Sequence, residues 1–260
     1  MTCRDIERLI LPYAQGAEIP PEAAAHITGC AKCASLVRAM AATEPAPIPS
    51  SERLQQIKAG IVAGLKPVKP LAPTRVFVAA LILIAAFAAA VGVFELGTAG
   101  WHALSVLQAA AVFTALAGCA LVLAVSLARQ IVPGSRVWLP AAWSVFGFLA
   151  IMGAIFAILY QPQREPTFIS TGLVCLRIGL ECALPVALLC WLILRRGAIL
   201  NPVAAGALTG ALAGLSGLLL LEIFCPNLNA YHILTWHLGA VVASTLGGTI
   251  IGVIVERVRK

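Results

Sequence analysis

Residues 76–94 read VFVAALILIAAFAAAVGVF, nineteen consecutive residues without a charge. An α-helix rises about 1.5 Å per residue, so about 20 such residues cross the ~30 Å hydrocarbon layer of a bilayer. Five more apolar runs of similar length follow. The six runs cover approximately residues 75–97, 102–128, 137–160, 170–194, 198–223 and 232–255. The sequence therefore predicts an all-α protein whose residues 75–260 form a bundle of six transmembrane helices.

The composition of the whole chain also favours a membrane protein. Of its 260 residues, 60% are hydrophobic and 11% are charged, and the mean hydropathy is +0.95. Soluble domains carry about 25% charged residues. The net charge of +7 would suggest nucleic acid as the partner of a soluble protein. Here the basic residues lie mainly near the N-terminus and in short loops, so we expect contact with a lipid bilayer and no direct binding of nucleic acid.

Charges in the loops predict the orientation of the bundle, because Lys and Arg concentrate on the cytoplasmic side. One set of connections holds Arg164 beside Glu165, or no charge at all, as in GTAGWH (97–102) and PNLNAYH (226–232). We therefore expect both termini in the cytoplasm, where the cysteines of an N-terminal head stay reduced. The basic connections contain Arg129, Arg136, Arg195, Arg196, Arg257, Arg259 and Lys260.

Residues 1–43 form the predicted head. They begin MTCRDIERLI, which is charged and has no apolar core of a signal peptide. A second helix can start at Pro20 and Pro21, and it or its continuation carries His26, Cys30 and Cys33. A first amphipathic helix, ending near Gln15, is predicted by the helical spacing of Ile6, Leu9, Ile10 and Tyr13.

The head contains four candidate metal ligands, Cys3 and the HxxxCxxC residues His26, Cys30 and Cys33. Two helical turns separate the last three, so they can face the first helix and meet Cys3. Thiolate and imidazole ligands of this number suit a closed tetrahedral Zn²⁺ site. About 40 residues bury too little apolar surface to fold alone, and zinc would supply the missing free energy. Cys3 is either the fourth ligand or a free thiol, in which case a water completes the site.

A linker over residues 44–74 is predicted to contain one amphipathic helix at 51–65. It is followed by KPVKPLAP (66–73), a proline-rich spacer expected to lie against an anionic membrane surface. The helix either binds a protein or lies on the membrane. It has few aromatic residues and its basic residues are not concentrated on the polar side, which favours the protein partner. Its apolar stripe consists of Leu54, Ile57, Ile61 and Leu65.

Two resemblances point to a function. Residues 24–40, AAHITGCAKCASLVRAM, resemble the zinc-binding anti-sigma domain. This resemblance implies that the head and a following helix, here 51–65, pack around an extracytoplasmic-function sigma factor and hide its polymerase-binding surfaces. The second half is similar to six-helix membrane anti-sigma proteins of the NrsF type, through Pro185, the turn Arg195-Arg196-Gly197, a small-residue fifth helix, Cys225-Pro226 and Trp236-His237. The chain thus resembles a fusion of two inhibitory modules.

Polar residues inside apolar helices are costly and are therefore functional candidates. Arg177 and Glu181 are one turn apart and are expected to pair on the bundle-facing side, either as a structural ion pair or as a signal relay. Glu222 is expected to reach the membrane interface. Cys175 and Cys225 are expected to meet near the periplasmic ends of helices four and five. There they could form a disulfide, or bind a soft metal with His232 or His237.

These observations predict a bacterial inner-membrane anti-sigma factor with Zn²⁺ in its head. It would hold an extracytoplasmic-function sigma factor and release it on a periplasmic, redox or metal stress. No nucleotide loop, catalytic triad or paired-carboxylate site is present in the sequence, so we expect no enzymatic activity. The alternatives are a small transporter or channel gated by a zinc domain, and a structural membrane subunit that recruits another complex through its head.

Overall fold

The computed structural model divides into two compact units, residues 1–68 and 69–260. Every regular element in its described part is a helix, which confirms the all-α class. Leu65 of the predicted stripe, the residues Gln15 and Lys260, and the loop residues Arg136 and Arg196 lie outside this part. The structure describes residues 2–14, 16–41, 50–64, 72–132, 135, 139–195, 197 and 199–259.

The head is built from three short helices, α1 (Cys3–Ala14), α2 (Pro21–Gly29) and α3 (Ala31–Ala41). Pro21 occupies the first turn of α2, where its missing amide hydrogen costs no hydrogen bond. The predicted second helix is broken at Cys30, whose backbone is extended, directly after the poor helix former Gly29. Among the described side chains, five buried ones form the small core of the head: Ile6, Ile10, Ala23, Ile27 and Cys33.

Helix α4 (Ser51–Gly64) follows the head in the sequence. The Arg53 amide donates a hydrogen bond to Ser50 Oγ at 3.3 Å, which caps the start of the helix. Every residue of α4 is exposed. The apolar stripe is exposed with the rest, to 49% at Leu54 and Ile57 and to 60% at Ile61. The helix therefore presents an exposed apolar face.

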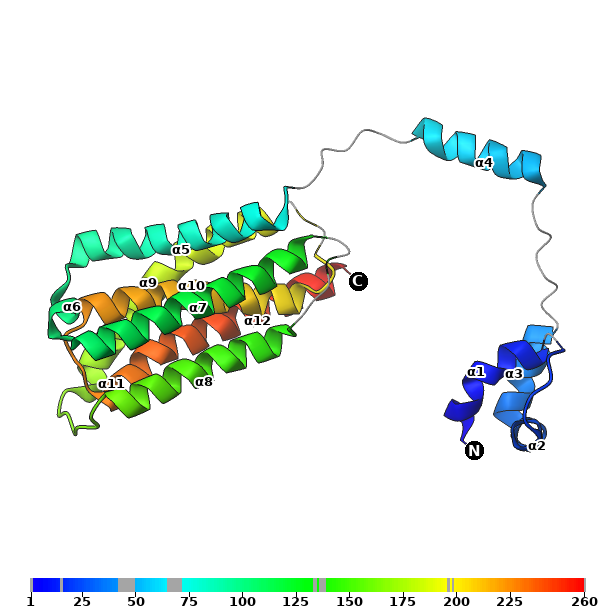
Figure 1. Ribbon diagram of the computed structural model, residues 1–260, viewed down its shortest axis with the longest axis horizontal. Coiled ribbons are helices and arrows are strands. Elements are labelled where there is room, and N and C mark those ends of the chain that lie inside the picture. The colour runs from blue at the N-terminus through cyan, green and yellow to red at the C-terminus, as the bar shows by residue number, and fades with distance from the viewer. Residues whose placement is uncertain are drawn as a thin grey trace. The chain divides into compact units, whose positions relative to one another are not determined.

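In the part of the second unit that the structure describes, six long helices run side by side (Figure 1). All six are long and apolar enough to cross a membrane, as the sequence predicted, the last being counted over Ala230–Arg259. Short elements connect them, namely α6 (Ala99–Ala103), α11 (Ala230–His232) and a π-helical turn, η1 (Ile233–His237). The long helices are α5 (Thr74–Leu96), α7 (Val106–Ile131), α8 (Ala141–Leu159), α9 (Phe168–Leu194), α10 (Pro202–Phe224) and α12 (Leu238–Arg259).

Helix α10 forms the centre of the bundle and contacts α5, α7, α8, α9 and α12. Its apolar window is 78% buried, against 17–33% in the other five spans. Small residues let α12 approach closely, because a Cβ added at Gly206 or Gly210 would collide with the backbone of Gly248 or Ser244. This close packing explains why α10 has so few large side chains on the face that contacts α12.

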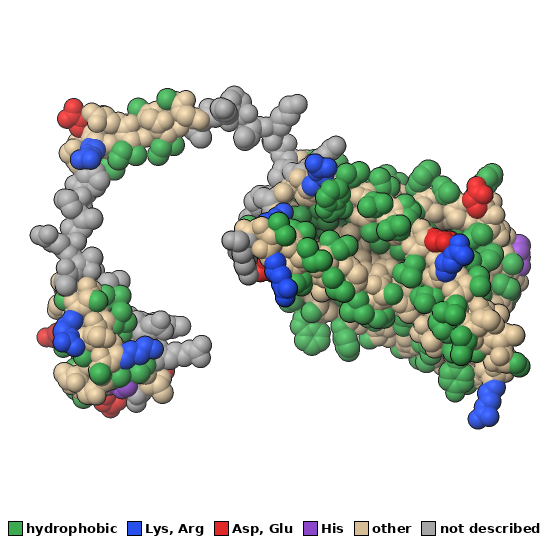
Figure 2. Space-filling model, turned by 180° about the vertical axis from the view of Figure 1, so that it is seen from behind, with side chains coloured by type: hydrophobic (Ala, Val, Ile, Leu, Met, Phe, Trp, Pro, Cys, Tyr) green, Lys and Arg blue, Asp and Glu red, His purple; other side chains and the backbone are tan. Residues whose placement is uncertain are grey.

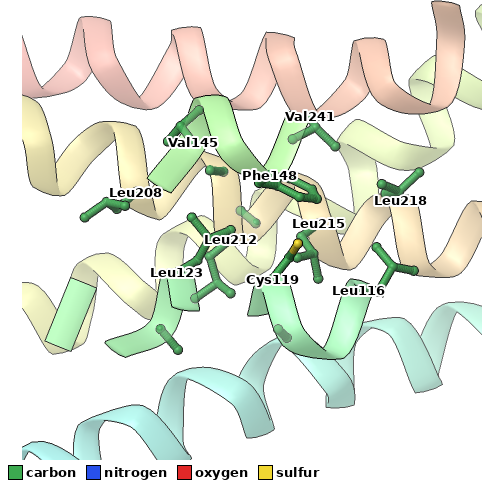
Figure 3. Packing of buried hydrophobic residues seen from close by; sticks show 14 of the residues in the cluster. Leu116, Cys119, Leu123, Val145, Phe148, Leu208, Leu212, Leu215, Leu218 and Val241 are labelled. Atoms are coloured by element: carbon green, nitrogen blue, oxygen red, sulfur yellow. The ribbon is translucent and has the colours of Figure 1, made fainter. Parts of the chain in front are cut away.

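Apolar side chains cover both the inside and the outside of the bundle. In the interior, Leu212 and Leu215 of α10 pack near Leu123 of α7 and Phe148 of α8 (Figure 3). On the surface, hydrophobic side chains are spread over the body (Figure 2), with Phe94 exposed to 87%. An apolar outer surface around an apolar core is the arrangement expected of a helical bundle in lipid.

A capping box and a contact with the end of α8 fix where α7 begins. We expected the second span to start at residue 102, but α6 occupies that position and α7 begins at Val106. Ser105 and Gln108 form a capping box, in which each side chain bonds the backbone amide of the other. The Gln108 side chain also donates to the Leu159 carbonyl at 2.9 Å, which ties the start of α7 to the end of α8.

Candidate functional site

The head brings its four predicted ligands together at the junction of its helices. Cys3 is the first residue of α1, His26 lies in α2, Cys30 stands at the break and Cys33 is in the first turn of α3. The Cys3 Sγ atom lies 3.6 Å from His26 Nε2 and 3.7 Å from Cys30 Sγ. The four ligand atoms all lie within 4.8 Å of one another. The extended conformation of Cys30 produces this cluster, since it turns the chain between α2 and α3.

These distances match a tetrahedral zinc site. With Zn–S near 2.3 Å and Zn–N near 2.0–2.1 Å, tetrahedral angles separate two sulfurs by about 3.8 Å and a sulfur from a nitrogen by about 3.6 Å. The observed separations of 3.7 and 3.6 Å agree with both values. Cys3 is close enough to be a ligand, and the donor set of three sulfurs and one imidazole suits Zn²⁺.

The thiols of the head have different proton affinities. The backbone amide of Cys33 donates toward the Cys30 sulfur and lowers the pKa of that thiol. Burial of Cys33 acts in the opposite direction and raises the pKa of its thiol to about 11. Cys33 therefore needs a nearby cation to become a thiolate at neutral pH, which a bound divalent ion would supply.

A second cluster lies at the end of the body opposite the C-terminus, where α9 begins and α10 ends (Figure 1). Cys175 belongs to the first part of α9, Cys225 directly follows α10, and His232 and His237 end α11 and η1. The two sulfurs are 3.6 Å apart, and Cys225 Sγ lies 3.8 Å from His232 Nε2. All four residues are buried, with exposures of 6%, 6%, 0% and 1%. The structure thus joins both histidines to the expected cysteine pair.

Glu222 is a residue of this region that sequence reasoning misjudged. It was expected to reach the interface, but it is only 3% exposed. His237 Nδ1 lies 2.9 Å from Glu222 Oε1, and the Tyr160 hydroxyl donates to Glu222 Oε2 at 3.4 Å. The cause is the central position of α10, whose last turn stays inside the bundle. The sequence contains one indication of this position. Glu222 and Cys225 are three residues apart, so they lie on the same side of the chain at the end of the helix.

Arg177 and Glu181 pair along α9, with Arg177 Nε donating to Glu181 Oε1 at 2.7 Å. Their side chains are 78% and 59% exposed, so the pair faces outward and not toward the bundle interior as expected. It borders a groove of about 900 Å³ between α9, α10 and α12. Because the two charges neutralise each other within one helix, they need no partner inside the bundle.

Comparison with known proteins gives one family. Residues 61–257 match the model of a protein family described as NrsF, negative regulator of sigma F. The match contains all six long helices and the second cluster, and it begins after the cysteine–histidine cluster of the head. No curated protein and no solved structure matches the chain.

Proposed function

Because the chain belongs to the NrsF family of negative regulators of sigma F, we propose that it is an anti-sigma factor of the bacterial inner membrane that sequesters an extracytoplasmic-function sigma factor. The observation that carries this proposal is the family match over residues 61–257. The head, with its cysteine–histidine cluster, would be a second inhibitory module fused to the family's membrane body.

The uncovered stripe of α4 supports a protein partner for this part of the chain. Leu54, Ile57 and Ile61 are each at least 49% exposed on one face. An apolar helix face that is exposed to water is usually covered by a groove of a binding partner. The groove contacts residues spaced by three and four along the helix. In our proposal the head and α4 hold the sigma factor from two sides, in the cytoplasm, where both termini lie.

The cysteine pair of the body supports a route for the signal. Cys175 and Cys225 have sulfurs 3.6 Å apart, so a small movement brings them to the ~2.05 Å of a disulfide. With hydrogen peroxide as the oxidant, the two thiols lose two hydrogens and the peroxide is reduced to two waters. A periplasmic oxidant or soft metal acting here would alter the packing of α9 against α10 and weaken the hold on the sigma factor.

Copurification tests the binding proposal. The full chain is expressed in its host, solubilised in detergent and captured, and sigma factors are identified by mass spectrometry. We expect one extracytoplasmic-function sigma factor with the wild type, and its loss with Ile57→Glu plus Ile61→Glu. The control Gln55→Glu plus Gln56→Glu changes the same helix outside the stripe and should retain the partner. A folded wild type with an intact head site and no sigma factor would overturn the proposal.

The sensing proposal has its own test. A reporter of the sigma factor's target promoter is measured with and without peroxide or a soft metal in cells carrying Cys175→Ser plus Cys225→Ser. We expect induction to disappear. Unchanged induction would remove this cluster from the mechanism and leave the head thiolates as the alternative sensor.

A further inference from the structure

We propose that Cys175, Cys225, His232 and His237 form a closed four-ligand site for one resident divalent cation with the ligand preferences of Zn²⁺. The inference rests on the proposed function for its role in signalling, because it assigns a ligand to the sensing region.

The separations of the ligand atoms fit a single tetrahedral ion. The Cys175 and Cys225 sulfurs are 3.6 Å apart, and Cys225 Sγ is 3.8 Å from His232 Nε2. All four ligand atoms lie within 4.8 Å of one another. A tetrahedral site requires about 3.8 Å between two sulfurs and about 3.6 Å between a sulfur and a nitrogen, so each of the two observed distances differs from its ideal value by about 0.2 Å. Modest adjustment of the side chains therefore closes the site.

The ring of His237 is oriented as that of a metal ligand. Its Nδ1 lies 2.9 Å from Glu222 Oε1, which fixes the ring and leaves Nε2 for a second partner. This Nε2 is buried, and none of the described residues gives it a hydrogen bond. A histidine with one nitrogen on a carboxylate and the other on a metal is the usual arrangement in metal sites. A bound cation would satisfy the buried nitrogen.

His232 has a similar but looser arrangement. Its Nε2 faces Cys225, and its Nδ1 lies 4.0 Å from Glu165 Oε2. The side-chain amide of Asn227 donates to the same carboxylate oxygen at 2.9 Å and holds it near the ring. Both histidines therefore have a carboxylate nearby, Glu222 at hydrogen-bond distance from His237 and Glu165 beyond hydrogen-bond distance from His232.

The π-helical turn brings the two histidines to one side of the chain. Residues five apart in an α-helix point about 140° away from each other, because each residue turns by about 100°. The wider turn η1 removes most of this angle, and the ring centroids of His232 and His237 are 5.2 Å apart. Single π turns are rare and occur often at functional sites. The proposed positions of the two histidine ligands explain why the chain forms a π turn here.

The charge and the chemical type of the ligands indicate which ion the site would bind. Two thiolates neutralise a divalent cation, and two imidazoles add no charge, so the complex can be buried at the edge of an apolar bundle. Sulfur and imidazole ligands favour Zn²⁺ over Mg²⁺ or Ca²⁺. Four protein ligands leave no open position, which is typical of a structural ion. The ion would join α9, the end of α10 and the turn before α12.

Cobalt substitution tests the site in the full chain. The background is Cys30→Ser plus Cys33→Ser, which removes the head site. The purified, reduced protein is titrated in detergent with Co²⁺, whose absorption is intense when thiolates bind it tetrahedrally. We expect one Co²⁺ per chain, displaced by Zn²⁺.

Cys225→Ser should abolish the spectrum, and Glu222→Gln should weaken binding about 10–100-fold. Cys182→Ser, also on α9 but outside the cluster, should bind as the background does.

Two results would overturn the proposal. If the reduced background protein keeps its helical circular dichroism and its elution volume but gives no tetrahedral Co²⁺ spectrum, the proposal is wrong. A mass two hydrogens lower before reduction, with no uptake of Co²⁺ afterwards, would assign the pair to a disulfide instead. Capture of the sigma factor is measured on chains with an intact head, with and without Cys225→Ser, because the background variant lacks the head site. Metal binding without capture overturns the proposed function alone, and capture without metal binding overturns only this inference.

Discussion

The head and the membrane body each contain a cysteine–histidine cluster, but the clusters have very different surroundings. Among the described residues, the head has five in its buried core, and its Cys3 is exposed. The described part of the body has a main core of 29 buried residues, and all four of its cluster residues are buried. In our proposal, metal ligation supplies the stability that the small core of the head lacks. For the body we expect packing to suffice for the fold, so a bound ion could be lost or replaced without unfolding the bundle.

Removal of metal should have the largest effect, and it should act on the head alone. Structural zinc contributes about 10–16 kcal/mol of apparent binding free energy, which couples directly to folding. In the full chain, Cys30→Ser plus Cys33→Ser should therefore abolish protection of α1 and α2 amides from hydrogen exchange. Lys32→Ala, between the two cysteines, is the control. Loss of protection in α10 as well would show that the two regions do not fold separately.

The next effect should come from the small core of the head. Ile6 is fully buried in α1, and Ile6→Ala should cost about 2–5 kcal/mol. Since zinc binding and folding of the head are coupled, this cost should appear as at least ~30-fold weaker zinc affinity in a chelator competition. Ile6→Val is the matched control and should weaken binding only a few-fold. Equal affinity in Ile6→Ala would mean that the head folds without depending on its metal.

A change of packing should act on the body and leave the head intact. Gly210→Val places a side chain against the Ser244 backbone, whereas Gly118 in α7 has open space around it. Overpacking of this kind costs about 1–3 kcal/mol. Thermal unfolding in detergent should therefore show a lower Tm for Gly210→Val and an unchanged Tm for Gly118→Val. Zinc bound by the head should stay the same in both variants, and a decrease would contradict the comparison.

The smallest expected effect concerns the surroundings of the body cluster. Tyr160→Phe removes the hydroxyl that donates to the Glu222 carboxylate at 3.4 Å. The loss of one long hydrogen bond should cost about 0.5–1.5 kcal/mol of stability, measured as a fall in Tm. Tyr231→Phe, at a side chain exposed to 54%, is the control and should have no effect. An equal fall in Tm in both variants would show that the buried hydroxyl of Tyr160 stabilises the protein no more than the exposed hydroxyl of Tyr231.

Sequence reasoning could predict the features that depend on solvent or on spacing. Lipid requires about 20 apolar residues per span, so hydropathy predicted six helices and their approximate ends. The motif around His26 indicated which four head residues would meet. The break at Cys30 was not predicted, because the helical spacing of His26, Cys30 and Cys33 allowed an unbroken helix. It is a property of the packed head and not of the local sequence.

The features that sequence reasoning missed depend on which helix is central. Nothing in a single apolar run shows whether it faces lipid or other helices, so Glu222 at the end of α10 could not be assigned to the interior. The same uncertainty placed Arg177 and Glu181 on the wrong side of α9. The π turn at 233–237 has no local sequence signal that distinguishes it from an α-helix, although it determines where His237 points.

The π turn also restricts how the length of this segment can vary. Five residues of a π turn advance about as far round the helix axis as four residues of an α-helix, so deleting one residue from 233–236 would restore an α-helix and leave the facing of α12 nearly unchanged. Gly248 and Gly252 would still face Gly206 and the start of α10, against which their backbones are packed. A deletion between Leu238 and Gly248 would instead rotate them by about 100°. Among related chains, the loss of one residue should therefore be tolerated at 233–236, whereas gaps between Leu238 and Gly248 should be absent.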